Sequence, residues 1–155
     1  MKTCFYFTLL ISIVILTALC AAAQVSKIVT VIVADGKDRE ICRFQAELAM
    51  TPEKRAQGLM FRASMRQRTG MLFVHADDGM QYFWMKDTYI PLDIIFINSR
   101  FEVVHVHHNA RPRDEKTITS HYPAMYVLEV NAGEAKACSI KRGTKVKLNG
   151  YVPER

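Results

Sequence analysis

The chain has 155 residues, half of which are apolar, and a formal net charge of +6 at pH 7. This length allows one domain with a substantial core, and the apolar fraction excludes a chain that is disordered throughout. Because the basic residues form short clusters without a basic helix or an aromatic stacking motif, the charge favours a solvated surface and argues against a nucleic-acid partner.

The N-terminus has the features of an export signal. Lys2 precedes an apolar run at 5–19, and three alanines at 21–23 provide a small-residue cleavage site. The sequence therefore predicts a signal peptide at 1–23 and a single mature domain at 24–155, which would be periplasmic or secreted. The alternative is an uncleaved membrane anchor, because the apolar segment is nearly long enough to span a bilayer.

The first part of the mature chain predicts two strands and a short helix. Residues 25–36 are rich in β-branched side chains and end in Asp-Gly, and residues 39–49 alternate between apolar and polar. These two segments predict a hairpin. Thr51 is a good N-cap, a proline follows it, and Gly58 is a typical helix end, so a two-turn helix is expected at 52–57.

The rest of the chain consists of short apolar segments bounded by turns. Strands are expected at 71–75, 80–86, 93–98, 101–108, 125–133 and 144–152, and a helical turn near 134. About eight short strands with one or two short helices predict a mainly β fold, a compact and mostly antiparallel barrel or sandwich. Within its strand, Glu129 is expected on the outer, solvated face, because its two neighbours face the other way.

Four motifs occur in a characteristic order. They are ELAMTPEKRAQGLMFR, GMLFVH, FWMKDTYIPLDIIFI and YVLEVNAG. With these motifs the chain resembles the domain of unknown function 192 family (DUF192) over about residues 47–148. The resemblance implies a compact, mainly β domain and no established activity. The family usually has Asn where this chain has Asp87.

The stretch FWMKDTYIPLD at 83–93 is the best candidate for a site, because polar side chains follow an apolar strand there. One interpretation is structural: Asp93 ends an inward-facing row and forms a buried ion pair with Arg62 or Lys86. The other is functional: five side chains surround a cleft that holds an anionic or ring-bearing ligand. These five are Arg62, Trp84, Lys86, Asp87 and Asp93.

The sequence favours a noncatalytic ligand-binding or accessory module of the cell envelope, with a small ligand or a protein as its partner. The enzyme alternative is a hydrolase of envelope carbohydrate or peptide that uses Asp93 or Asp87 as acid or base. No serine lies in a nucleophile elbow, so no convincing catalytic motif supports the alternative. No cofactor is predicted, and the oligomeric state is not indicated.

A third function would be copper or zinc handling. His105 and His107 lie two residues apart on one strand face and could chelate a metal, and the seven methionines after the signal could bind copper(I). The simpler interpretation is that the histidines lie at an exposed strand end and that the methionines fill the core.

Cys42 and Cys138 remain after removal of the signal peptide. In an exported chain two cysteines allow one intramolecular disulfide, which would close a loop of about a hundred residues. Two buried free thiols would give the same sequence pattern.

Overall fold

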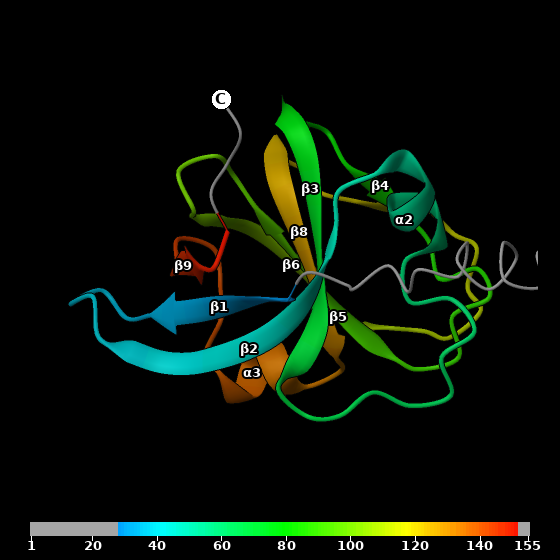
Figure 1. Ribbon diagram of the computed structural model, residues 1–155, viewed down its shortest axis with the longest axis horizontal. Helices are drawn as coiled ribbons and strands as arrows, with labels where there is room; N and C mark the ends of the chain where they lie inside the picture. The colour runs from blue at the N-terminus through cyan, green and yellow to red at the C-terminus, as the bar shows by residue number, and fades with distance from the viewer. Residues whose placement is uncertain (1–27, 152–155) are drawn as a thin grey trace, which may run out of the picture.

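The computed structural model describes residues 28–151 (Figure 1). The predicted signal peptide at 1–23 lies outside these residues and stays a prediction. Within the described range, no helix is long and apolar enough to cross a membrane. The range forms nine strands and two short helices: β1 (Ile28–Ala34), β2 (Glu40–Ala49), α2 (Pro52–Gln57), β3 (Thr69–Gly79), β4 (Tyr82–Phe83), β5 (Leu92–Ile97), β6 (Val103–Ala110), β7 (Ile118–Thr119), β8 (Ala124–Asn131), α3 (Glu134–Ala137) and β9 (Lys145–Asn149).

Seven strands form one sheet in the order β6-β5-β8-β3-β2-β1-β9, and β4 pairs with β7 separately. All paired neighbours are antiparallel except β2 and β3, whose parallel pairing requires the crossover segment that contains α2. The ladder stays open, although its two edges meet where Glu102 bridges to Lys145. The predicted mainly β, mostly antiparallel fold is confirmed, in a sandwich-like form.

Local sequence cues set several elements. The two predicted hairpins form as β1–β2 and β5–β6. The predicted helix 52–57 is α2, and its N-cap Thr51 accepts a hydrogen bond from the backbone N–H of Lys54 at 3.2 Å. The strand expected at 80–86 is wrong in length, since only β4 forms. The chain turns after it because the backbone N–H of Met85 bonds to Asp114 instead of continuing the ladder.

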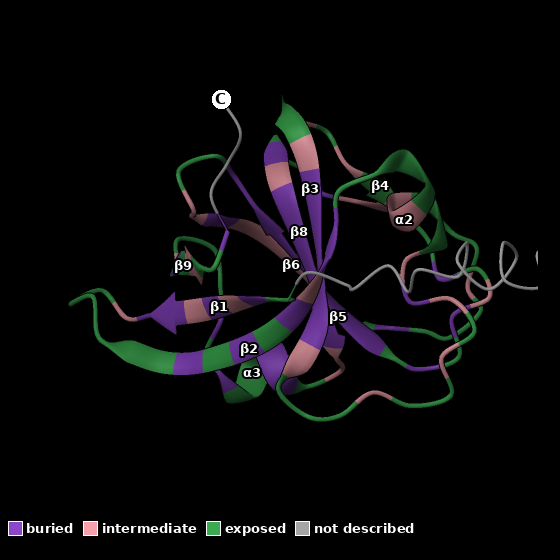
Figure 2. Ribbon diagram, in the orientation of Figure 1, coloured by how far each residue is buried: buried purple, intermediate pink, exposed green. Residues whose placement is uncertain are grey.

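The sheet carries a hydrophobic core on each face. Alternate residues of β3 show this: Leu72 packs in the first core with Phe44, whereas Phe73 packs in the second core with Met85 and Ile94. Figure 2 shows β5 and β8 as almost wholly buried. Strands covered on both faces are apolar nearly from end to end, which explains the continuous apolar runs of these two segments.

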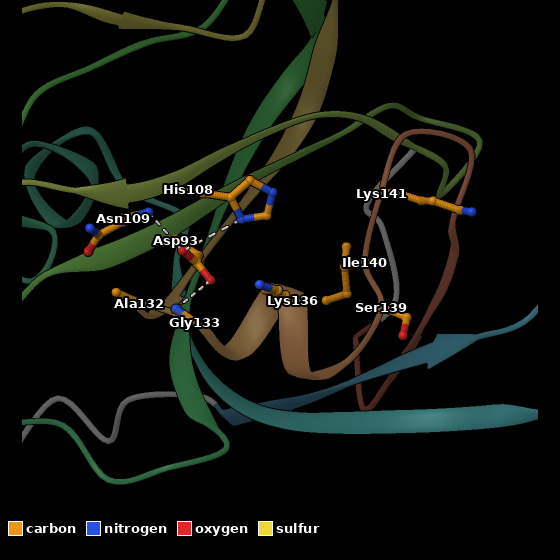
Figure 3. Close-up of a pocket in the computed structure, with 9 residues that line it drawn as sticks. All are labelled: Asp93, His108, Asn109, Ala132, Gly133, Lys136, Ser139, Ile140 and Lys141. Carbon is orange, nitrogen blue, oxygen red and sulfur yellow. Dashed lines mark hydrogen bonds and ion pairs between the residues drawn. The ribbon is translucent and has the colours of Figure 1, made fainter.

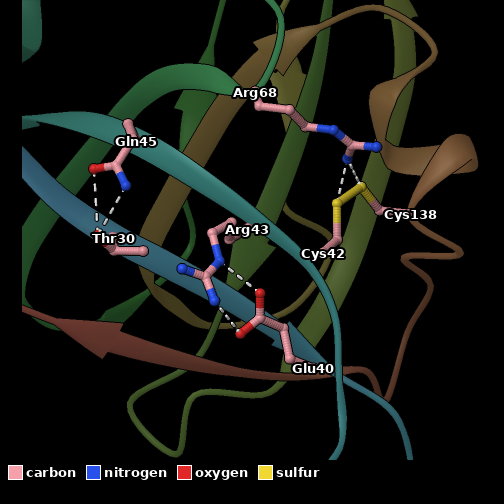
Figure 4. Close-up of polar contacts among 7 residues, drawn as sticks. All are labelled: Thr30, Glu40, Cys42, Arg43, Gln45, Arg68 and Cys138. Carbon is pink, nitrogen blue, oxygen red and sulfur yellow. Dashed lines mark hydrogen bonds and ion pairs between the residues drawn. A yellow bond between two sulfur atoms is a disulfide. The ribbon is translucent and has the colours of Figure 1, made fainter.

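Cys42 and Cys138 form a disulfide in the first core (Figure 4). The bond joins β2 to the residue after α3, 96 positions later in the chain. The guanidinium of Arg68 contacts both sulfur atoms. The disulfide therefore connects the early and late parts of the fold across the first core.

Replacing both cysteines by serine should lower the free energy of unfolding by about 4–5 kcal/mol, because the unfolded chain regains the entropy of a loop of about a hundred residues. Urea denaturation of the double variant against the oxidised protein measures the difference. A loss below about 1 kcal/mol would show that the disulfide does not restrain the unfolded chain in this way.

Candidate functional site

The segment 83–93, here called the corner, is fixed by backbone hydrogen bonds. Asp87 accepts from the N–H of Phe61 at 2.8 Å, and Thr88 accepts from the N–H of Arg113 at 3.0 Å. Asp87 itself has a φ of 51°, in the left-handed region that Asn and Asp tolerate better than most residues. Asn tolerates this conformation as well as Asp does, so an Asn at position 87 would not strain the backbone.

Asp93 is fully buried, and its carboxylate is surrounded by backbone donors (Figure 3). Oδ1 accepts from the N–H of Asn109, and Oδ2 accepts from those of Gly133 and Ala135, each at 2.9 Å. The expected ion pair with Arg62 or Lys86 is therefore wrong. Backbone amides at the end of β6 and around α3 provide the hydrogen bonds that a buried carboxylate needs.

Arg62 and Lys86 have other partners. Both terminal nitrogens of Arg62 bind the carboxylate of Glu47, at 2.6 and 2.8 Å. The ammonium of Lys86 lies 5.3 Å from the centre of the Trp84 ring, in a cation–π contact. Both contacts lie at or near the surface, where they contribute modestly to stability.

The five predicted site residues do not surround one cleft. Asp93 lines a cavity of about 600 Å³ together with His108, Lys136 and Lys141. Arg62 and Trp84 line two other hollows. The structure separates the five residues, because Asp93 points toward α3 while Trp84 lies beside α2. The ligand-binding role predicted for them stays a prediction.

The hollow beside Trp84 is here called the Glu129 pocket, and its volume is about 380 Å³. It lies between the turn after α2, the strands β3 and β4, and the corner. Its lining residues are Arg55, Ala56, Gln57, Gly58, Leu59, Met60, Phe73, His75, Tyr82, Phe83, Trp84, Thr88 and Glu129. Apolar and aromatic walls are combined with the polar side chains of Arg55, Gln57, His75, Thr88 and Glu129, a combination typical of small-molecule sites.

Glu129 is only 4% exposed, so the solvated face expected for it is wrong. The residue lies in the central strand β8, between Met71 of β3 and Ile94 of β5. In the described part of the chain its carboxyl has no hydrogen-bond or ion-pair partner. Burial raises the pKa of Glu129 to about 8, so the side chain is mostly uncharged at neutral pH.

His75 is the second polar group of the pocket without a partner. Its Nε2 atom is buried and has no hydrogen bond to any described residue. Burial lowers the pKa of His75, and the charge of Arg55 lowers it further, so the ring is neutral at neutral pH. One terminal nitrogen of Arg55 is itself occupied, since Nη1 donates to the carbonyl oxygens of Met50 and Val74.

Sequence reasoning missed Glu129 as a site residue, and it considered His75 only as a possible metal ligand beside His105 and His107. A signal was present for Glu129, because a carboxylate within the apolar run YVLEV is unusual for a strand buried on both faces. His75 offered no comparable signal, since the turn ADDG directly follows it and the strand was expected to end there.

One of the two histidines considered for metal binding, His105, packs against aromatic rings. His105 stacks on Phe96 at 5.8 Å between ring centres and meets the edge of His121 at 4.6 Å. Within residues 28–151, no group of three or more His, Cys, Asp or Glu side chains could hold a metal ion. Met85 is fully buried in the second core. The metal hypothesis therefore stays a prediction without support from such a group in the described residues.

The chain belongs to the DUF192 family, described as "Uncharacterized ACR", whose sequence profile matches residues 31–148. A solved structure of a proposed transcription regulator from Sinorhizobium meliloti 1021 is 37% identical, with a TM-score of 0.77, and covers 83% of this chain and 100% of that chain. A protein of unknown function from Novosphingobium aromaticivorans DSM 12444 is 39% identical, with a TM-score of 0.74, over 81% of this chain and 89% of that chain. No curated protein matches.

Replacing Asp93 by Asn should lower the free energy of unfolding by about 3 kcal/mol, because an amide nitrogen would face backbone N–H donors. The control is Asp87→Asn, which suits the left-handed backbone and should change stability by less than about 0.5 kcal/mol. Urea denaturation measures both variants. Equal losses of unfolding free energy in the two variants would show that the hydrogen bonds of Asp93 do not stabilise the fold.

Glu129 should make the protein less stable as the pH rises from about 5 to about 8, because the unfolded chain releases this proton near its ordinary pKa while the folded chain keeps it. Replacement by Gln should remove about 3 kcal/mol of this pH dependence. Histidines with lowered pKa values make the protein more stable as the pH rises, in the wild type and in Glu129→Gln alike. The difference between the stability–pH curves of these two proteins therefore isolates the contribution of Glu129. Parallel stability–pH curves for both proteins would contradict its burial as an uncharged acid.

Proposed function

We propose that this protein is an exported, noncatalytic module that binds a small ligand in the Glu129 pocket. The supporting observation is the buried carboxyl of Glu129, which lines a cavity and has no partner within the described chain. Burying a polar group without a hydrogen bond costs free energy. A ligand that supplies the missing hydrogen bonds would offset this cost, so the group favours a binding role for the pocket.

The predicted corner takes part in this proposal. Trp84 and Thr88 belong to the corner and line the pocket, and Phe83 connects it to β4. The edge of Phe83 packs against Phe73 with 5.1 Å between ring centres, which holds this wall in place. The proposed site therefore keeps only Trp84 of the five residues predicted near FWMKDTYIPLD and adds Glu129 and His75, since Arg62, Lys86, Asp87 and Asp93 do not line this pocket.

Two features support export. The first is the predicted signal peptide at 1–23. The second is the Cys42–Cys138 disulfide, because disulfides persist mainly in oxidising compartments such as the periplasm or the exterior. The proposed location is therefore periplasmic or secreted.

The enzyme and nucleic-acid alternatives have less support. Three backbone donors occupy the oxygens of Asp93, which suits a structural role better than proton transfer. The regulatory role in the description of the Sinorhizobium protein is not carried over to this chain. Helices that read DNA place several turns in the major groove, whereas α2 and α3 have six and four residues.

A thermal-shift screen with sugars, amines, carboxylates and short peptides tests the binding role. A ligand at about a hundred times its dissociation constant should stabilise the protein by about 2.7 kcal/mol and raise Tm by several degrees. The shift should disappear in Trp84→Ala and persist in Tyr122→Ala, an exposed aromatic outside the pocket lining. A shift that survives in Trp84→Ala would place the ligand elsewhere.

A further inference from the structure

Two side chains of the Glu129 pocket share an unusual property: Glu129 and His75 are both uncharged at neutral pH, and both lack hydrogen bonds within the described chain. A protonated carboxyl and a neutral imidazole can each donate one hydrogen bond and accept another. The ligand group that complements both is one that also donates and accepts, and a hydroxyl has this property.

The charges around the pocket disfavour ionic ligands at its base. A cation would meet the guanidinium of Arg55, which also lines the pocket. An anion would have to be desolvated beside the carboxyl of Glu129, and Arg55 already uses its Nη1 for two backbone carbonyls. An uncharged polar group avoids both costs.

The walls add a preference for the shape of the ligand. Tyr82 and Trp84 line the pocket and are 67% and 48% exposed, so a ligand in the pocket can cover their rings. The ammonium of Lys86 makes a cation–π contact with the Trp84 ring. Aromatic faces carry partial negative charge and bind the positively polarised C–H groups of a ring that lies flat on them.

The positions of the two polar groups indicate the length of the ligand. Glu129 pairs with Met71, and His75 lies four residues further along β3 on the same face, so their backbone positions are separated by roughly 13 Å along the strand. A single sugar ring does not bridge this distance, whereas two linked rings do. The cavity of about 380 Å³ falls within the range of small-molecule sites.

We infer that the Glu129 pocket binds an uncharged saccharide of two or more rings, with hydroxyls on Glu129 and His75 and a ring face on Trp84. This inference rests on the proposed function and names its ligand class. It also predicts a pH effect, because an ionised Glu129 loses its donor. The other titratable or charged groups that line the pocket are Arg55, His75 and Tyr82, and burial lowers the pKa of His75 further from this range.

The chain has one tryptophan, Trp84, so its fluorescence reports directly on the pocket. The experiment titrates the protein with the disaccharides maltose, cellobiose and diacetylchitobiose, with glucose as a single-ring probe, and with glucosamine, glucuronate and trialanine as charged and peptide probes. At least one uncharged disaccharide should change the Trp84 emission with saturation, and its affinity should exceed that of glucose. The matched control Tyr122→Ala should bind with unchanged affinity.

Two variants of Glu129 make the test specific. Glu129→Leu should abolish disaccharide binding, because it removes both hydrogen bonds. Glu129→Gln keeps a donor and an acceptor, so it should still bind at about pH 9, where the wild type should lose about tenfold in affinity. Circular dichroism of both variants confirms that they are folded.

The outcomes separate the two proposals. If only glucosamine, glucuronate or trialanine binds, and Glu129→Leu abolishes that binding, the pocket is a ligand site but the saccharide inference is wrong. If no probe changes the emission of Trp84, both the saccharide inference and the proposed function are overturned. Equal binding by Glu129→Leu would also overturn the inference.

Discussion

Coverage of β8 on both faces is the constraint on which this structure depends. The strand lies between β3 and β5, so its backbone hydrogen bonds are made on both sides. The first core covers one face, and the segments around α2 and the corner cover the other. Gly70 allows β3 to approach closely, since a Cβ there would lie 2.2 Å from the carbonyl oxygen of Glu129. A polar side chain in the middle of β8, such as that of Glu129, is therefore forced into the interior.

Two buried carboxyl groups respond to this packing in opposite ways. The fold surrounds Asp93 with three backbone N–H donors, which join β6 and α3 to the end of β5. The same fold gives Glu129 no partner within the described chain and leaves it beside a cavity. Asp93 therefore stabilises the structure, whereas Glu129 destabilises it at neutral pH and is the better candidate for recognition.

Much of the fold could be predicted from local patterns. Alternating or continuous apolar segments with turn residues between them indicated the β1–β2 and β5–β6 hairpins, and the Thr51 cap and Gly58 indicated α2. These features depend on residues close in the sequence. The motifs shared with DUF192 also identified the family before any contact was known.

The site could not be predicted in the same way, because its contacts are between distant segments. Asp93 finds its donors about 16 to 42 residues away, so no local pattern distinguishes them from Arg62. Whether Glu129 faces solvent or the interior depends on what covers β8, and alternation within YVLEV fits both. The corner lines the pocket through Trp84 and Thr88, whereas Glu129 reaches the same pocket from another strand.

The central claim is that Glu129 is an uncharged acid in an open pocket of the folded protein. The most direct measurement is the ¹³C chemical shift of its carboxyl carbon from about pH 4 to about pH 10, assigned by comparison with Glu129→Gln. The account predicts a titration midpoint near 8 for the free protein. A ligand that donates hydrogen bonds to the ionised carboxylate should lower this midpoint, and a ligand that accepts a hydrogen bond from the protonated carboxyl should raise it. A midpoint near 4.5, the ordinary value for glutamate, would contradict it.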